Sequence, residues 1–172
     1  MALILETSRL ILKEFEISDA AFILELLNTE SWKKYIGDRN VHTVSDAISY
    51  LQNGPISSYQ KNGFGLWLVE LKESNIPIGM CGLIKRDDFE YPDIGFAFLP
   101  SFTGKGFAYE IAKPILDWAN VRPGFETILA ITVPENSSSI KLLQKLGLSL
   151  IEEIVWGEEL ELLLKFSTGE KR

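Results

Sequence analysis

The sequence predicts a single α/β (α+β) domain built on a mixed, mostly antiparallel β-sheet. Residues 64–99 hold three apolar segments separated by short turns, which is typical of an antiparallel meander. After Pro100 the spacing of apolar residues changes from about two to about 3.6, and a strand-like segment follows, which predicts a helix in a parallel crossover. The 172 residues, 46% of them hydrophobic, suffice for one core, and we expect one domain over 1–172 because no linker divides them.

Three short elements are expected before the meander. Residues 8–15 alternate apolar and polar side chains, which predicts a strand. The Ser-Asp pair at 18–19 can cap a helix with one apolar face. Thr43 and Asp46 have the spacing of a capping box, which predicts a second helix, and the Gly-Pro pair at 54–55 should end it.

The remaining elements follow from the same periodicities. The long helix after Pro100 contains Pro114, which should kink it or loosen one turn. A shorter helix should begin near Ser137 and end at Gly147. The expected strands are 64–71, 78–85, 93–99 and 127–133, followed by a final hairpin of 148–156 and 160–166.

Charge and hydropathy exclude some classes of partner. The formal net charge is −7, which argues against a protein that binds the phosphates of nucleic acids. The charge is compatible with an amine-bearing substrate, and equally with ordinary solubility. No window reaches the roughly 18 apolar residues that a membrane helix needs, and the N-terminal segment does not read as a signal peptide. We therefore expect a cytoplasmic protein that does not bind membranes.

Single residues limit the possible chemistry. Cys81 is the only cysteine and lies in an apolar strand-like segment, so we expect an inert core thiol and no disulfide. His42 is the only histidine, which argues against a multi-histidine metal site and against a Ser-His-Asp triad. We expect no metal. Proton transfer in an enzyme of this composition would fall to carboxylates, tyrosine, serine or water.

The most informative segment is the turn between the third meander strand and the long helix. Gly104 and Gly106 allow a ligand to approach the backbone closely, and Lys105 between them adds a cation. The first N–H groups of the helix and its dipole favour an anion, so the turn predicts a pyrophosphate site. The alternative is a helix start that happens to use glycine. The spacing is not that of a Walker loop, and Tyr109 occupies the third glycine position of a dinucleotide fingerprint.

This segment, Leu-Pro-Ser-Phe-Thr-Gly-Lys-Gly-Phe-Ala-Tyr-Glu at 99–110, resembles motif A of the GNAT acetyltransferases, Gln/Arg-x-x-Gly-x-Gly/Ala. Gly104 and Gly106 are in register with the motif, whereas Ser101 stands where Gln or Arg is usual. Further segments resemble GNAT proteins in the right order, and two of them resemble the Rim-type branch of ribosomal-protein N-terminal acetyltransferases. The two Rim-type segments are 6–12 and 35–37. The other segments that resemble GNAT proteins are 93–96, 134–140 and 145–147.

The resemblance implies a sheet with a splayed central strand pair and direct transfer of an acetyl group from acetyl-CoA to a primary amine. The acceptor, either a protein N-terminal α-amine or a small molecule, stays open, as does the choice between monomer and homodimer. The strand before motif A would pair with pantetheine, and backbone N–H groups of the turn would hold the phosphates. The residues implied are Phe96, Ala97, Phe98 and Leu99 for the strand, and Thr103, Gly104, Lys105, Gly106, Phe107 and Ala108 for the turn.

The resemblance also implies candidates for the chemistry. Asn136 would contact the cofactor or an ordered water, or would cap a helix. Ser139 would lie near the sulfur, with a small packing residue as the alternative. Leu143 occupies the position at which many GNAT enzymes carry a tyrosine that protonates the thiolate, so Ser139, water or Tyr109 would supply that proton. Asp93 is the candidate base, or else a solvated aspartate at a strand edge.

Four further residues are candidates for substrate binding. Glu70 is a second candidate base on the neighbouring strand. Trp32 and Tyr35 are expected to line the acceptor groove, and Trp67 either lines it or belongs to the core. Two other functions remain open at this point. One is a CoA-binding sensor or interaction module without catalysis, and the other is a nucleotide-binding domain that uses the glycine turn for a triphosphate.

Overall fold

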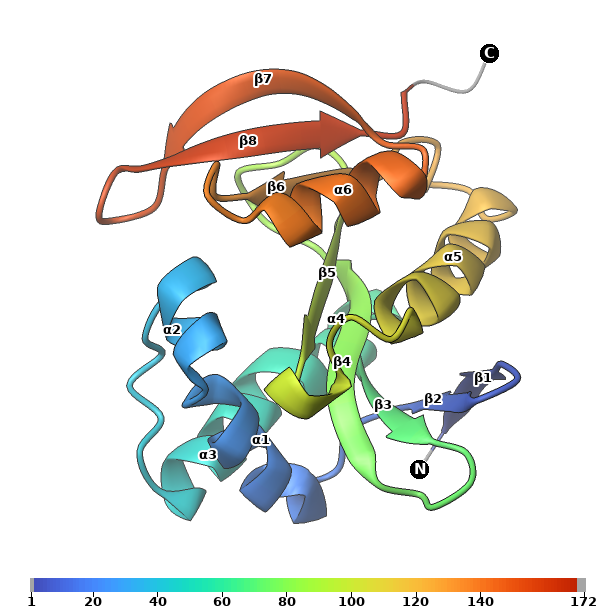
Figure 1. The fold of residues 1–172 in the computed structure, drawn as a ribbon, viewed down its shortest axis with the longest axis vertical. Helices are drawn as coiled ribbons and strands as arrows, with labels where there is room; N and C mark the ends of the chain where they lie inside the picture. The colour runs from blue at the N-terminus through green and yellow to red at the C-terminus, as the bar shows by residue number, and fades with distance from the viewer. Residues whose placement is uncertain (1, 170–172) are drawn as a thin grey trace.

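The fold is an eight-stranded sheet in the order β1-β2-β3-β4-β5-β6-β8-β7, covered by helices (Figure 1). The computed structural model describes residues 2–169. All neighbouring strands are antiparallel except β5 and β6, which are parallel. The strands are β1 (Leu3–Glu6), β2 (Leu10–Lys13), β3 (Leu66–Leu71), β4 (Pro77–Ile84), β5 (Asp93–Phe98), β6 (Leu129–Thr132), β7 (Ser149–Trp156) and β8 (Glu161–Ser167).

Two sets of helices pack on the sheet, and alternating strand residues divide between two core clusters. Leu68 and Met80 belong to the cluster of α1 to α3, whereas Trp67 and Cys81 belong to the cluster of α5 and α6, as expected for strands with both faces buried. The helical elements are η1 (Ile17–Asp19), α1 (Ala20–Leu27), α2 (Glu30–Tyr35), α3 (Val44–Leu51), η2 (Gln52–Ile56), α4 (Ser57–Asn62), η3 (Pro100–Phe102), α5 (Phe107–Asn120) and α6 (Ser137–Lys145).

The two parallel strands meet at only one end. Asp93 and Leu129 are the one residue pair in the β5–β6 register, and the Leu129 N–H donates to the carbonyl of Pro92 at 2.9 Å. On its other side β5 pairs along its whole length with β4. Figure 1 shows β5 running away from β6 and from the β7–β8 hairpin beyond it. We call the opening between β5 and β6 the seam.

The main elements that the sequence predicts are confirmed. The meander of β3, β4 and β5, the crossover through α5, the helix α6 and the final hairpin all form. Gly147, with φ +93°, follows the end of α6 as expected. Thr43 and Asp46 form the predicted capping box of α3. Pro114 lies inside α5, which continues as one helix to Asn120.

Several details differ from the sequence prediction. The strand expected over 8–15 is shorter, and both β1 and α2 were not predicted. Gly54-Pro55 does not end a helix, because η2 is a π-helical turn that leads directly into α4. Proline keeps a helical φ and removes a single N–H donor, and the wider turn accommodates that loss. Asp19 accepts a hydrogen bond from the N–H of Glu16 at 2.8 Å and so caps η1 rather than α1.

Within residues 2–169, no helix combines the length and the apolar character needed to cross a membrane. The single-domain prediction for 1–172 also includes Met1 and residues 170–172, which lie outside the described part of the chain.

Candidate functional site

The glycine turn lies between η3 and α5, at the carboxyl end of β5. Gly104 and Gly106 have φ values of +71° and +82°, a left-handed conformation that strains any residue with a Cβ. Gly106 is the N-cap of α5, and residues 103 to 106 are exposed. No atom lies within 4 Å of the position that a Cβ of Gly104 would take. The turn therefore presents open backbone at the start of a helix.

Backbone donors gather at this turn. The N–H groups in the first turn of α5, those of Phe107 and Ala108 among them, have no acceptor within the helix. The positive end of the helix dipole lies at the same place, so the turn is suited to an anion. The N–H of Thr103 differs from the others, because it donates to the carbonyl of Pro100 at 3.3 Å.

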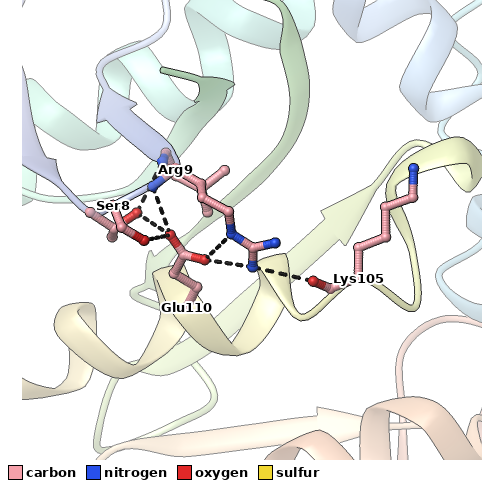
Figure 2. Close-up of polar contacts among 6 residues, drawn as sticks. Ser8, Arg9, Lys105 and Glu110 are labelled. Carbon is pink, nitrogen blue, oxygen red and sulfur yellow. Dashed lines mark hydrogen bonds and ion pairs between the residues drawn. The ribbon is translucent and has the colours of Figure 1, made fainter. Parts of the chain in front are cut away.

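A network from the N-terminal segment fastens this turn to its helix (Figure 2). Arg9 donates from Nε to Glu110 Oε2 at 2.7 Å and from Nη2 to the carbonyl of Lys105 at 3.2 Å. Glu110 Oε1 also accepts from Thr7 Oγ1 at 2.6 Å, from Ser8 Oγ at 3.2 Å and from the backbone N–H of Arg9 at 3.0 Å. The sequence analysis did not identify Arg9 or Glu110 as functional, although Arg9 lies within the segment 6–12 that resembles the Rim-type branch.

The network holds Glu110 in its ionised form. Burial raises the pKa of Glu110, but the hydrogen bonds from Thr7 and Arg9 and the charge of Arg9 outweigh this and lower the pKa below its usual value. Glu110 lies in the first turn of α5, where a negative charge also interacts favourably with the helix dipole.

The strand that leads into the turn is open toward the seam. Although β5 lies in the interior of the sheet, three of its residues are only half-buried: Gly95, Phe96 and Ala97. The central residues of the neighbouring strand β4 are all buried. Phe98 and Leu99 are buried, each with 9% of its surface exposed. Because β6 does not pair with this part of β5, the backbone polar groups on the β6 side of β5 are left for a ligand or for water.

Asn136 and Ser139 lie on the other side of the seam, just after β6. The carboxyl ends of two parallel neighbours lie at the same edge of a sheet, so α6 begins on the same side as the glycine turn. Asn136 caps α6, because its Oδ1 accepts from the N–H of Ser139 at 3.2 Å. Ser139 is 9% exposed. Leu143 is buried in the core, and its hydrocarbon side chain has no proton to transfer.

Tyr109 lies on α5 close to α6. The Lys145 Nζ stands 4.2 Å from the centroid of the Tyr109 ring, and this cation–π contact links the two helices. Lys105 Nζ lies 5.5 Å from the ring centroid of Phe102. Two lysines thus stand beside the start of α5 and the end of α6 in a chain of net negative charge.

Asp93 lies at the closed end of the seam and is paired with Arg86. Arg86 donates from Nε and Nη2 to the two carboxylate oxygens of Asp93 at 2.7 and 3.2 Å. The Asp93 residue is 1% exposed. Burial raises its pKa, and the hydrogen bonds and charge of Arg86 offset only part of that rise. Asp93 is therefore a buried, paired carboxylate rather than the solvated strand-edge aspartate that the sequence left as an alternative.

The candidate substrate residues are divided between the faces of the sheet. Trp32 and Tyr35 both lie on α2. Trp32 is 5% exposed, and within the described residues its buried Nε1–H has no hydrogen-bond partner. Trp67 is in the opposite core cluster, where its ring packs edge-on against Trp118 at 5.6 Å, so the structure places it in the aromatic core. Glu70 is 6% exposed and pairs with Lys13 Nζ at 2.6 Å. It lies four residues along β3 from Leu66, the end of that strand that is level with Gly95 of β5.

The remaining single residues lie outside this arrangement. Cys81 is buried, and burial raises the pKa of its thiol, as expected for an inert core cysteine. Within residues 2–169, no group of three or more His, Cys, Asp or Glu side chains is placed to hold a metal ion.

Comparison with known proteins decides the family. A family model for the acetyltransferase (GNAT) domain matches residues 9–149 of the chain. The chain belongs to the GNAT acetyltransferase family. Two similar curated proteins are named as uncharacterized N-acetyltransferases. They are p20 of Bacillus licheniformis, 31% identical over 83% of this chain and 80% of its own length, and YoaA of Bacillus subtilis, 28% identical over 84% of this chain and 81% of its own length.

The fold is also that of solved GNAT structures. RimL, a ribosomal L7/L12 alpha-N-protein acetyltransferase solved in complex with coenzyme A, superposes with a TM-score of 0.84. The match covers 96% of this chain and 97% of RimL at 14% sequence identity. The GNAT fold that the motifs predict is thereby confirmed, including the open sheet with its splayed parallel pair.

Proposed function

We propose that this GNAT protein binds acetyl-CoA along the seam and transfers its acetyl group to a primary amine. The observation that carries the proposal is the junction of two features. Beyond Asp93 the strand β5 is unpaired on its β6 side, and it ends in a glycine turn that opens onto the N-terminus of α5. An extended chain with amide groups fits the first feature, and a pyrophosphate fits the second. Acetyl-CoA carries both in one molecule.

The residues present fit this ligand. Gly104 leaves the turn open because no atom of the protein fills the space beside its Cα. The backbone N–H groups of Gly104 to Ala108 would hold the phosphates, with Lys105 as a nearby cation, while the N–H of Thr103 stays with Pro100. The backbone of Phe96 to Leu99 would pair with the pantetheine amides. Acetyl-CoA supplies an acyl group on a good leaving thiolate.

The chemistry requires two proton transfers. The amine nitrogen forms a bond to the acetyl carbon, the carbon–sulfur bond breaks, the amine loses a proton and the thiolate gains one. Asp93 stands at the closed end of the seam, and its carboxylate is the group of this chain proposed to accept the amine proton through water. Arg86 holds that carboxylate in place. Ser139 and Asn136, at the start of α6, are proposed to face the sulfur.

The proposed acceptor is a protein N-terminus or a small-molecule amine. The net charge of −7 favours an approaching cationic amine, and α2, with Trp32 and Tyr35, contributes residues on the side of the sheet that Asp93 faces. RimL acts on a protein N-terminus, and the segment 6–12 resembles its branch. A protein N-terminus is therefore the first acceptor to test.

A second function has its own support. Leu143 replaces the usual tyrosine, and Asp93 is held by Arg86. Both features fit a domain that binds CoA without transferring acetyl groups.

The first experiment is thermal unfolding with saturating acetyl-CoA, with CoA, ATP and NAD as the comparison ligands. A ligand at about 100 times its Kd adds roughly 2.7 kcal/mol, which should raise the Tm of a chain of this size by about 5–10 °C. A rise limited to acetyl-CoA and CoA supports the proposed ligand, and acetylation of a peptide N-terminus or polyamine then decides between enzyme and sensor. A larger rise with ATP would overturn the proposal.

A further inference from the structure

The contacts of Arg9 point to a role in shaping the phosphate-binding turn. We propose that Arg9, anchored by Glu110, is a positioning residue that fixes the Lys105–Gly106 peptide in its phosphate-binding orientation. The inference rests on the proposed function. In it, Arg9 controls the affinity for the pyrophosphate part of the acetyl donor and not the affinity for the rest of that molecule.

The argument starts from the geometry of one peptide bond. In a trans peptide the C=O and the following N–H point in opposite directions. Arg9 Nη2 donates to the carbonyl of Lys105 at 3.2 Å, so the N–H of Gly106 in the same peptide points away from Arg9. That leaves the Gly106 N–H free to join the other donors of the turn.

Glycine makes this peptide easy to rotate. Rotating the peptide changes ψ of Lys105 and φ of Gly106, and glycine accepts positive and negative φ almost equally. Gly106 has φ +82°, and the Arg9 Nη2 atom lies 3.6 Å from where a Cβ of this residue would be. The glycine that gives the turn its shape does not by itself select one orientation, so a contact from outside the turn is needed.

Arg9 is itself held in place from several directions. Its Nη2 and Nε both reach Glu110 Oε2, at 2.6 and 2.7 Å, and its guanidinium carbon lies 4.3 Å from the ring centroid of Phe107. Glu110 is anchored in turn by Thr7, Ser8 and the Arg9 backbone (Figure 2). One guanidinium therefore ties the turn, the first turn of α5 and the segment before β2 into a fixed arrangement.

The network is not needed to hold α5 on the sheet. Phe107, Ile111 and Ile115 anchor that helix in the main core cluster. The Arg9 side chain is 48% exposed, and exposed ion pairs contribute little to folding. The contacts of Arg9 thus act on the shape of the turn more than on the stability of the fold.

The test compares Arg9→Lys with the wild-type protein. Lysine keeps the positive charge but has no fork with which to reach Glu110 and the Lys105 carbonyl together. The Kd for CoA, measured by calorimetry, should rise about tenfold, the amount expected for loss of one hydrogen bond from a charged group. The kcat/KM with acetyl-CoA should fall equally, while that with S-acetylpantetheine, which lacks the pyrophosphate, should not change.

Glu110→Gln distinguishes positioning from direct contact with the phosphates. If Arg9 positions the turn, this variant weakens CoA binding, and the double variant Arg9→Lys/Glu110→Gln binds no worse than Arg9→Lys alone. If Arg9 were instead a direct phosphate ligand, Glu110→Gln would free it and leave CoA affinity unchanged or higher, which would overturn the inference. Lys113→Gln, which breaks the exposed pair with Asp117 on the same helix, is the control and should bind CoA normally.

The two levels of the proposal fail differently. A wild-type protein that does not bind CoA overturns the proposed function and this inference together. A wild-type protein that binds CoA, with an Arg9→Lys variant that binds it equally well, overturns the inference alone. Equal losses of kcat/KM with acetyl-CoA and with S-acetylpantetheine would also overturn it, because they would indicate general disruption rather than control of the turn.

Discussion

Arg86 and Asp93 form a two-point ion pair across the loop between β4 and β5, with Nε–Oδ1 and Nη2–Oδ2 distances of 2.7 and 3.2 Å. The pair lies where β5 and β6 meet, at the one residue pair that joins the two parallel strands. It therefore links the proposed catalytic carboxylate to the closed end of the seam, and its charge state should affect both stability and rate.

The stability contributed by Asp93 should fall as the pH rises. Burial raises the pKa of Asp93 above its ordinary value despite Arg86, so the native state keeps its proton at pH values at which the unfolded chain has released it. In that window, which begins near pH 4, stability decreases with increasing pH. Urea titrations of the wild type and of Asp93→Asn check this. The unfolding free energy of the wild type minus that of the variant should decrease as the pH is raised above about 4. A difference that grows with pH would mean that Arg86 outweighs burial.

Asp93→Asn should also slow acetyl transfer. An amide has no basic oxygen to accept the amine proton, so the rate should fall by about 10²-fold or more. The pH–rate profile should also lose the step that reflects ionisation of the Asp93 carboxyl in the wild type. The Kd for CoA should stay the same, because the glycine turn lies at the other end of β5. An unchanged rate would remove Asp93 as the base and direct attention to water.

Gly104→Glu should abolish CoA binding at a modest cost in stability. The residue has φ +71° and open space around it, so the side chain fits but strains the backbone by about 1–2 kcal/mol and puts a negative charge at the proposed phosphate site. Gly157→Glu is the matched control, because Gly157 also has open space and a positive φ of +84° but lies in the β7–β8 turn. Both variants should lose similar stability in thermal unfolding, and only the first should lose CoA affinity in calorimetry.

Gly82→Ala should strongly destabilise the sheet. A Cβ at this position would stand 2.1 Å from the carbonyl oxygen of Gly65 and 2.8 Å from the Cα of Leu66, and backbone atoms cannot move away cheaply. We expect a loss of about 3 kcal/mol or more in urea unfolding. Gly95→Ala, on the neighbouring strand, meets only side-chain atoms, the Cδ1 of Ile84 at 3.0 Å and the Cδ2 of Leu66 at 3.4 Å, and should cost about 1 kcal/mol. Equal losses would contradict the close approach of β3 and β4.

The two suggested roles of Asn136 are separable. Asn136→Ala removes the acceptor for the Ser139 N–H and should cost about 1 kcal/mol of stability. Asn136→Asp keeps that acceptor and should retain wild-type stability. If the Asn136 amide also contacts the ligand, both variants should show reduced kcat/KM. Wild-type activity in Asn136→Asp would show that this residue is a helix cap and nothing more.

Local sequence patterns predicted most of the fold and the glycine turn of the candidate site. The strands of the meander were predictable because their apolar segments end at short turns, and the turn was predictable because Gly104 and Gly106 are needed where φ is positive. The first strand, Leu3–Glu6, was missed because it is a four-residue edge strand without a buried side chain to give it a pattern. The short α2 was missed for a related reason, since six residues are too few to show helical periodicity.

The contacts that tune the site were beyond local patterns. Arg9 and Glu110 are 101 residues apart, and only the packing of the segment before β2 against α5 brings them together. Arg86 and Asp93 are close in sequence, but the loop between them had to be known before the aspartate could be recognised as paired. Single-sequence reasoning thus located the turn and left the charge state of its surroundings open.

The opening between β5 and β6 has a consequence for how this protein can evolve. In the proposed function its ligand-facing groups are peptide N–H and C=O groups, which every residue except proline carries in full. The half-buried side chains of Phe96 and Ala97 can therefore vary more freely than the core residues Ile94 and Phe98 while recognition is retained, and what selection preserves is the path of the chain. Deep mutational scanning of Phe96 and Ala97 should accordingly tolerate changes in polarity and size more readily than proline, and relatives that share the ligand need share little of the sequence that surrounds it.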